Sequence, residues 1–342
     1  MTAEPEAGNG RAAIQVQGLT RRFGEVVAVD GLAFEVGRGE LFGLVGPDGA
    51  GKTTTLRMLA GVLRPTSGDA LVEGVSMARD PETAKPGIAY MSQRFGLYAD
   101  LTVAENLAFY ADLYGVPRAE RPERLARLYR FSGLEPFRDR LAGQLSGGMK
   151  QKLGLSCALI HQPRVLLLDE PTFGVDPVSR RDLWLIVHEM VALGITAVVS
   201  TAYLDEAERF DRVAFMHRGR LLALDRTDGL RAGLAGRLLA VEAADPRAAR
   251  QALAGHAAVE RAAVFGERLH LTVPEGADAA AAAKAVAEAL ASAGLPPRSV
   301  GPATPTLEDA FMDHVARAEL ARAEAPASAR FPGATGSRSR RV

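Results

Sequence analysis

Residues 46–53 read GPDGAGKT, directly after the apolar run LFGLV (41–45) and at the start of the helical stretch TTTLRMLAG (53–61). The pattern is G-x-x-x-x-G-K-[ST], and a buried strand before it with a helix after it is the setting in which such a loop holds phosphate. Its glycines allow successive backbone N–H groups to point at phosphate oxygens, and the helix adds the positive end of its dipole. The stretch therefore predicts an α/β fold that binds a nucleotide by its phosphates.

The loop also supplies the charge and the metal ligand that a nucleoside triphosphate needs. Lys52 places a positive charge on the terminal phosphates, and the Thr53 hydroxyl is a hard oxygen ligand for Mg²⁺. A solvated glycine turn is the competing interpretation, which the flanking strand and helix disfavour. We expect the nucleotide to contact the whole loop: Gly46, Pro47, Asp48, Gly49, Ala50, Gly51, Lys52, Thr53 and Thr54.

Two adjacent carboxylates end a second apolar run, VLLLDE (165–170). Beside a phosphate loop, Asp169 is suited to hold Mg²⁺ and Glu170 to polarise the attacking water. Ordinary solubilising loop residues are the bland alternative, and the phosphate loop makes it the poorer one. We therefore expect Asp169 to be a metal-site residue and Glu170 and Lys52 to be catalytic.

The rest of the chain predicts two domains. Short apolar runs alternate with helical stretches over residues 14–225, as in an α/β domain, and an Ala-rich region, 226–318, follows in the order strand, helix, strand, strand, helix, strand. That second order is typical of a small ferredoxin-like α+β domain. We expect a flexible N-terminus over residues 1–13 and a disordered tail over 319–342, which is rich in Pro, Gly, Ser and Arg.

Composition excludes several classes of function. Lys plus Arg and Asp plus Glu both number 41 in the 342 residues, so no global positive field favours nucleic acid. Cys157 is the only cysteine, which rules out an intrachain disulfide, and its apolar helical surroundings favour a buried structural role. No run approaches the roughly 20 apolar residues that span a bilayer. Any work on a membrane is therefore expected to pass through a partner.

A second phosphate-facing helix start occurs in LSGGMKQ (145–151). Ser146, Gly147 and Gly148 precede the helical stretch MKQKLGLSCALI, so they present another set of backbone N–H groups. One molecule cannot easily close both loops around a single nucleotide. The motif therefore predicts that the phosphate it faces belongs to another molecule.

With these motifs in view, residues 14 to about 225 resemble the nucleotide-binding subunit of an ATP-binding cassette (ABC) transporter, a P-loop NTPase. The resemblance implies ATP and Mg²⁺ as cofactors and ATP hydrolysis as the activity. It implies that Phe23 stacks on adenine, and that Gln93 is catalytic, touches Mg²⁺ and faces the membrane partner. It also implies that Ser146, Gly147 and Gly148 cover the γ-phosphate of the other protomer, and that Asp176 in PTFGVDP reaches across the dimer.

The partners implied by the resemblance are a transmembrane permease subunit and a second ATP-binding cassette, in a homodimer or a heterodimer, with no nucleic acid. Its implied location is cytoplasmic, peripheral on the inner face of the cell membrane. The C-terminal domain, with TPTLEDAF at 304–311, looks like the appendage of drug-exporter, ABC-2 type cassettes.

One position departs from the family. In STAYLDEAERFD (200–211), Ala202 stands where the family has a histidine that hydrogen-bonds the γ-phosphate. A methyl group cannot donate a hydrogen bond, so we expect slow hydrolysis at this chain's own site. Tyr203 and His217 are the candidate substitutes, and we expect neither to serve, because Tyr203 would point to the opposite face of the extended backbone and His217 ends the next strand. Asp48 replaces the usual Asn, and its charge either lies near the phosphates or turns away from them.

Two other functions remain open. In one, ATP drives dimerisation to regulate another machine. In the other, the chain is a degenerate ATP-binding clamp in a heterodimeric cassette pair. Glu170 argues against the clamp, and Ala202 argues for it.

Overall fold

The computed structural model describes residues 12–93 and 96–324. The chain divides into two compact units, one up to Thr227 and one from Asp228. Each unit has a hydrophobic core of its own. The short helix α7 (Thr227–Ala232) lies at the division.

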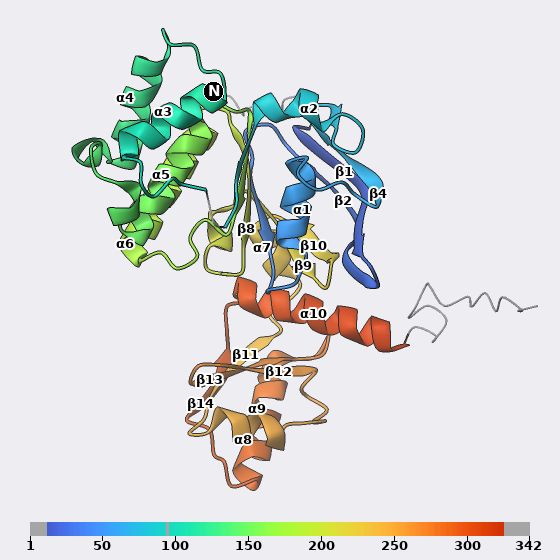
Figure 1. Ribbon diagram of the computed structural model, residues 1–342. Helices are drawn as coiled ribbons and strands as arrows, with labels where there is room; N and C mark the ends of the chain where they lie inside the picture. The colour runs from blue at the N-terminus through green and yellow to red at the C-terminus, as the bar shows by residue number, and fades with distance from the viewer. Residues whose placement is uncertain (1–11, 94–95, 325–342) are drawn as a thin grey trace, which may run out of the picture. The chain divides into compact units, whose positions relative to one another are not determined.

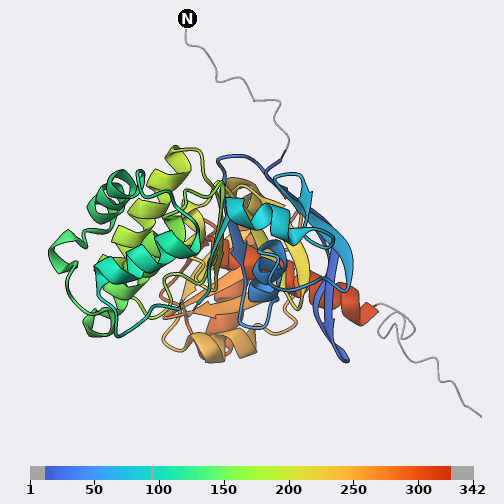
Figure 2. The same ribbon diagram turned by 45° about the horizontal axis from the view of Figure 1, so that its top comes forward.

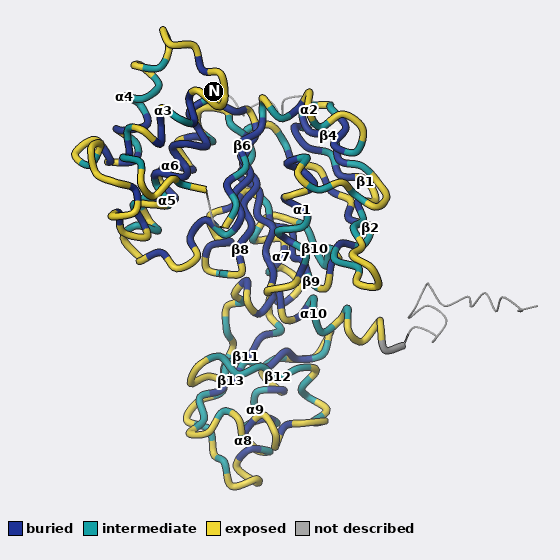
Figure 3. Tube along the Cα trace, viewed as in Figure 1, coloured by how far each residue is buried: buried dark blue, intermediate teal, exposed yellow. Residues whose placement is uncertain are grey.

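A six-stranded sheet forms the centre of the first unit, in the order β10-β9-β3-β8-β7-β6. Neighbouring strands are parallel except β10, which pairs antiparallel with β9. Its strands are β3 (Leu41–Val45), β6 (Ile88–Met91), β7 (Val165–Asp169), β8 (Thr196–Thr201), β9 (Arg212–His217) and β10 (Arg220–Asp225). Every residue of β3, β7 and β8 is buried, as expected for parallel strands covered on both faces (Figure 3).

A smaller antiparallel sheet lies on one side of the central sheet (Figure 1). Its strands are β1 (Ile14–Phe23), β2 (Val26–Val36), β4 (Ser67–Val72) and β5 (Val75–Ser76). Helix α1 (Lys52–Leu59) packs between the two sheets, where its Leu56, Met58 and Leu59 join one core with residues of both. This packing fixes the start of α1 against the carboxyl ends of the parallel strands, which we call their outlets.

The larger helices of the first unit gather on the other side of the central sheet (Figures 1 and 2). They are α3 (Val103–Leu113), α4 (Arg121–Ser132), α5 (Gly147–Leu159) and α6 (Pro177–Ala192). The remaining short elements are α2 (Pro81–Ala84) and the 3-10 turns Lys85–Gly87, Glu135–Phe137, Ala142–Gln144 and Ala207–Arg209. Side chains cap the helix starts: Ser146 caps α5 and Asp176 caps α6.

The second unit confirms the ferredoxin-like arrangement, because its sheet has the order β12-β13-β11-β14 with antiparallel neighbours. Its elements are β11 (Leu238–Glu242), α8 (Pro246–Ala252), β12 (Arg261–Phe265), β13 (Arg268–Thr272), α9 (Ala279–Ser292), β14 (Ser299–Pro302) and α10 (Leu307–Glu324). Val286 and Leu290 of α9 pack in its core. On α10, Asp309 Oδ1 lies 2.8 Å from His270 Nδ1 of β13, which ties this helix to the sheet.

Two expected boundaries are wrong. Residues 319–324 belong to α10 and not to a disordered tail, because Leu320, Ala321 and Arg322 are strong helix formers that prolong it. Ala13 is buried in the core, and its backbone N–H donates to the Val36 carbonyl at 2.9 Å, so it belongs to the folded unit and not to a flexible N-terminus. Residues 1–11 and 325–342 lie outside the described part of the chain.

Within residues 12–93 and 96–324, no helix is both long enough and apolar enough to span a bilayer.

Candidate nucleotide-binding and hydrolysis site

The loop between β3 and α1 is shaped by backbones that pack against its glycines. A Cβ on Gly46 would lie 2.1 Å from the Met216 carbonyl oxygen, and one on Gly51 would lie 2.5 Å from that of Ala28. Gly51 also has a φ of 100°, which side chains rarely adopt. The loop therefore requires glycine at both positions, for reasons that lie within the chain.

Lys52 points back into this loop and is only 4% exposed. Its Nζ donates to the carbonyls of Gly46 at 2.7 Å and Pro47 at 3.1 Å, and it lies 3.1 Å from Glu170 Oε1. The ammonium thus occupies the space enclosed by the loop. Pro47, Asp48 and Gly49 form the exposed tip, Ala50 is buried, and Thr54 is half-buried in the first turn of α1.

Asp169, at the outlet of β7, is held by three hydroxyl groups from three elements. Its Oδ1 accepts from Thr53 Oγ1 at 2.9 Å and from Ser200 Oγ at 2.7 Å, and its Oδ2 accepts from Tyr90 at 3.3 Å. Burial, with the Asp169 carboxylate beside it, raises the pKa of Tyr90 to about 12, so that phenol stays a donor. The structure brings together the two hard oxygens expected at a Mg²⁺ site, Thr53 Oγ1 and Asp169 Oδ1, and this donor chemistry fits the ion.

Glu170 follows Asp169 in a left-handed backbone conformation, with a φ of 49°. For a residue with a side chain this costs roughly 1–3 kcal/mol, a strain typical of functional positions. Its backbone N–H donates to Ser200 Oγ at 3.0 Å, and its Oε2 accepts from Gln93 Nε2 at 3.1 Å. Glu170 therefore contacts both other residues expected to be catalytic, Lys52 and Gln93.

Sequence reasoning missed Ser200 and Tyr90. Ser200 is fully buried, and its hydroxyl joins the Asp169 carboxylate to the Glu170 N–H. A hydroxyl within the apolar strand ITAVVS was the available signal, since a buried polar group must find a partner. Which partner it finds depends on β8 lying between β3 and β7.

Ala202 is exposed just beyond the outlet of β8. The neighbouring hydroxyl is used elsewhere: Thr201 Oγ1 donates to Glu206 Oε2 at 2.8 Å and accepts from the Tyr203 N–H at 3.0 Å. The Tyr203 ring lies under the Arg180 guanidinium of α6, 4.9 Å from ring centroid to Cζ. His217 ends β9, which is separated from β8 by β3. Tyr203 is therefore engaged with α6, and His217 ends a strand two positions away from the strand that leads to Ala202.

The serine-glycine motif and Asp176 form a second cluster. Ser146 Oγ accepts from the Met149 N–H at 3.3 Å, and Ser146 and Gly147 are exposed. Asp176 accepts from the backbone N–H of Ser179 at 2.9 Å, and these helix-start hydrogen bonds hold the pKa of its carboxyl below the usual value. Asp176 is thus a helix cap in this chain. Gly148 touches the same turn: a Cβ there would lie 2.1 Å from Ser179 Oγ.

Phe23 ends β1 with 47% of its surface exposed, so a core role is excluded. The Arg21 guanidinium covers its ring, with Cζ 4.6 Å from the centroid. An exposed ring of this kind is able to stack on a flat base.

Within the described ranges, no group of three or more His, Cys, Asp or Glu is arranged to hold a metal ion. Cys157 is buried, and burial raises the pKa of its thiol, which agrees with a structural role.

The fold and the site define a P-loop nucleotide-binding protein. Residues 29–173 match the family model described as "ABC transporter". Among curated proteins, the chain is 43% identical over 309 residues, 88% of its length, to the probable multidrug ABC transporter ATP-binding protein YbhF of Escherichia coli (strain K12). It spans 52% of that protein.

A second relative is matched over most of its length. The daunorubicin/doxorubicin resistance ATP-binding protein DrrA of Streptomyces peucetius is 39% identical over 241 residues, which cover 70% of this chain and 73% of DrrA. The solved structure of an ATP-binding subunit of an ABC transporter superposes with a TM-score of 0.60 at 33% identity, covering 65% of this chain and 93% of that one. The chain belongs to the ATP-binding proteins of the ABC transporter family. It spans about half the length of the YbhF proteins that it matches.

Proposed function

We propose that this chain binds and hydrolyses ATP to power a membrane exporter through a separate transmembrane partner, and that its own site hydrolyses slowly. The observation that carries the proposal is the meeting of Lys52, Thr53, Asp169 and Glu170 where β3 and β7 end. A loop cation, paired hard oxygens and a second carboxylate are the parts that phosphoryl transfer to water requires.

Each residue has a definite part in this proposal. Lys52 exchanges its loop carbonyls and Glu170 for the terminal phosphates of ATP. Thr53 and Asp169 hold Mg²⁺, which neutralises phosphate charge when bound. Glu170 accepts a proton from the attacking water. The water oxygen then bonds to the γ-phosphorus while the bond from that phosphorus to the leaving ADP oxygen breaks. Gln93 orients the Glu170 carboxylate through their 3.1 Å hydrogen bond.

The base and the second protomer complete the site. Phe23 stacks its exposed face on adenine, with Arg21 on the other side of the ring. Ser146, Gly147 and Gly148 cover the γ-phosphate of a second cassette, and the exposure of Ser146 and Gly147 supports this.

Slow hydrolysis follows from the outlet of β8. A preorganised donor to developing charge is typically worth on the order of 100 to 1000 fold in rate, and Ala202 provides none. ATP binding depends on the loop, on Lys52 and on the base stack, so it should be little affected. Ala202 also favours a second candidate function, a cassette that serves as an ATP-binding clamp and leaves hydrolysis to a different partner cassette.

The exporter role rests on the relatives. YbhF and DrrA are named for multidrug transport and for daunorubicin/doxorubicin resistance, and a further relative, 38% identical, is named Nod factor export ATP-binding protein I. We infer a permease partner and a peripheral position on the inner face of the membrane. Purification from the native membrane with identification of co-purifying chains tests this: a permease with no other cassette supports the exporter, and a permease with a different cassette supports the clamp.

Nucleotide binding is tested by replacing the loop lysine. Lys52→Ala should weaken MgATP binding at least about tenfold in calorimetry, because a charged contact to phosphate is lost. Lys85→Ala is the matched control, since Lys85 pairs with Glu82 on the surface. Equal affinity of the wild-type chain and Lys52→Ala would refute the assigned site.

A further inference from the structure

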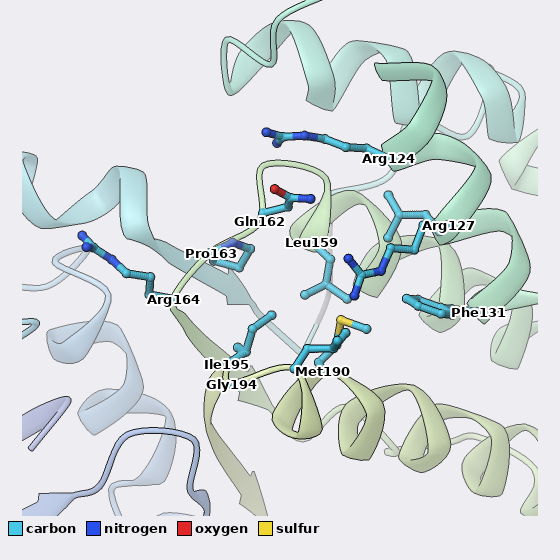
Figure 4. Close-up of a pocket in the computed structure, with 12 residues that line it drawn as sticks. Arg124, Arg127, Phe131, Leu159, Gln162, Pro163, Arg164, Met190, Gly194 and Ile195 are labelled. Atoms are coloured by element: carbon cyan, nitrogen blue, oxygen red, sulfur yellow. The ribbon is translucent and has the colours of Figure 1, made fainter. Parts of the chain in front are cut away.

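A cavity of about 310 Å³ opens on the helical side of the first unit (Figure 4). It lies between α4 and the last turns of α5 and α6, and its apolar wall includes Phe131, Leu159, Met190 and Ile195. Its volume is at the low end of the roughly 300–1000 Å³ of small-molecule sites. The opposite ends of α5 and α6 carry Ser146 and Asp176.

The three arginines that line this cavity differ in whether they have a hydrogen-bond or ion-pair partner. Arg124 donates to the Ile160 carbonyl at 3.0 Å and pairs with Glu120, and Arg164 lies 3.7 Å from Glu73. Arg127 has no carboxylate within ion-pair distance in the described part of the chain. Its guanidinium lies 5.4 Å from the Phe131 ring centroid and extends between Leu159 and Phe131, whereas Arg164 points away from the apolar wall (Figure 4).

The dipole of α5 does not account for Arg127. The C-terminal ends of α5 and α6 each carry roughly half a negative charge, which attracts cations. Arg124 already supplies a positive charge at the C-terminal end of α5, because its guanidinium donates a hydrogen bond to the Ile160 carbonyl there. Arg127 instead rests on an aromatic ring, where a cation–π contact leaves its outward N–H groups able to bind an anion.

We propose that this cavity binds a small amphipathic anion, with a carboxylate or sulfonate head on the Arg127 guanidinium and an apolar body against Phe131, Leu159 and Met190. The charge selects against cationic and neutral amphiphiles, and the apolar wall selects against small hydrophilic anions such as acetate. This site is separate from the nucleotide site and does not depend on the activity proposed above.

Decanoate, below its micelle concentration, is the probe for the full-length protein. Calorimetry should show saturable binding at one site per chain. Decanol should bind at least about tenfold more weakly, because it lacks the charge-assisted hydrogen bond, and decylammonium should not bind. Equal binding of decanol and decanoate, or no saturable binding of decanoate, would overturn the proposal.

Variants locate the site. Arg127→Gln should lower decanoate affinity at least about tenfold, while Arg130→Gln, an exposed arginine on the same helix, should leave it unchanged. Phe131→Ala should weaken binding of decanoate and of a longer-chain carboxylate alike. Each variant is first shown to bind MgATP like the wild-type chain, which establishes that it is folded. Equal losses in Arg127→Gln and Arg130→Gln would mean general surface attraction and contradict the site.

Discussion

The outlets of β7 and β8 lie side by side in one parallel sheet, yet they are equipped in opposite ways. At β7, Asp169 and Glu170 are held by groups from the phosphate loop, β6 and β8. At β8, the chain leaves the sheet at the exposed methyl of Ala202, and the Thr201 hydroxyl turns to Glu206. On the function proposed above, the end of β7 supplies a Mg²⁺ ligand and a water-activating base, whereas the end of β8 supplies no donor to the γ-phosphate.

The largest expected effect comes from removing the base at the β7 outlet. Glu170→Gln should lower phosphate release by about 100 fold or more, because general base catalysis typically contributes that much. Its MgATP affinity should stay within about threefold of wild type, since the phosphate contacts remain. With hydrolysis blocked, light scattering should detect an MgATP-dependent dimer of this variant.

Glu189→Gln on the exposed surface of α6 is the control for loss of one carboxylate. Turnover in Glu170→Gln equal to wild type would show that the β7 outlet does no chemistry, and the contrast between the two outlets would then lose its meaning.

A sharper test uses two neighbouring hydroxyls of β8. Ser200→Ala should lower turnover roughly tenfold and raise the Mg²⁺ concentration needed for half-maximal rate, because Asp169 loses a buried hydrogen bond. Thr201→Val removes the hydroxyl that serves Glu206 instead. It should lower the melting temperature without moving the Mg²⁺ dependence. If turnover depended on Mg²⁺ concentration in the same way in both variants, Ser200 would have only a structural role.

Placing a hydrogen-bond donor at position 202 should remove the functional difference between the ends of β7 and β8. Ala202→His should raise turnover of the isolated chain about tenfold, if the imidazole reaches the γ-phosphate as an oxyanion donor must. The gain should vanish in the Ala202→His, Glu170→Gln double variant, because histidine positions water but does not replace the base. A wild-type chain that already turns over at about 1 per second or faster would show that another group does this work.

The smallest expected effect belongs to the third outlet, that of β3. Asp48 is exposed at the loop tip, where water screens its charge. Asp48→Asn should therefore strengthen MgATP binding by no more than about threefold, and less at high salt. A change above tenfold would mean that the carboxylate faces the phosphates.

The sequence predicted features whose causes are local. The phosphate loop follows from glycine spacing between a strand and a helix, and Asp169 and Glu170 follow from carboxylates at the end of an apolar run. The roles of Ser200 and Tyr90 were not predictable in this way, because they depend on which strands are neighbours. The contact between Lys52 and Glu170 also joins residues far apart in the chain. Strand order is a global property that periodicity does not encode.

The tight contact between Gly148 and Ser179 has a consequence for how this sequence can change. Both Ser179 Cβ and Oγ would lie within 2.2 Å of a Cβ at position 148, so replacing the serine by alanine would not make room. Only glycine at 179 would, at a cost to the start of α6 of about 1 kcal/mol. In sequences that evolve from this one, a side chain at position 148 should therefore occur only together with glycine at position 179. Such covariation would arise from the steric clash between α5 and α6 and would not require a bound nucleotide.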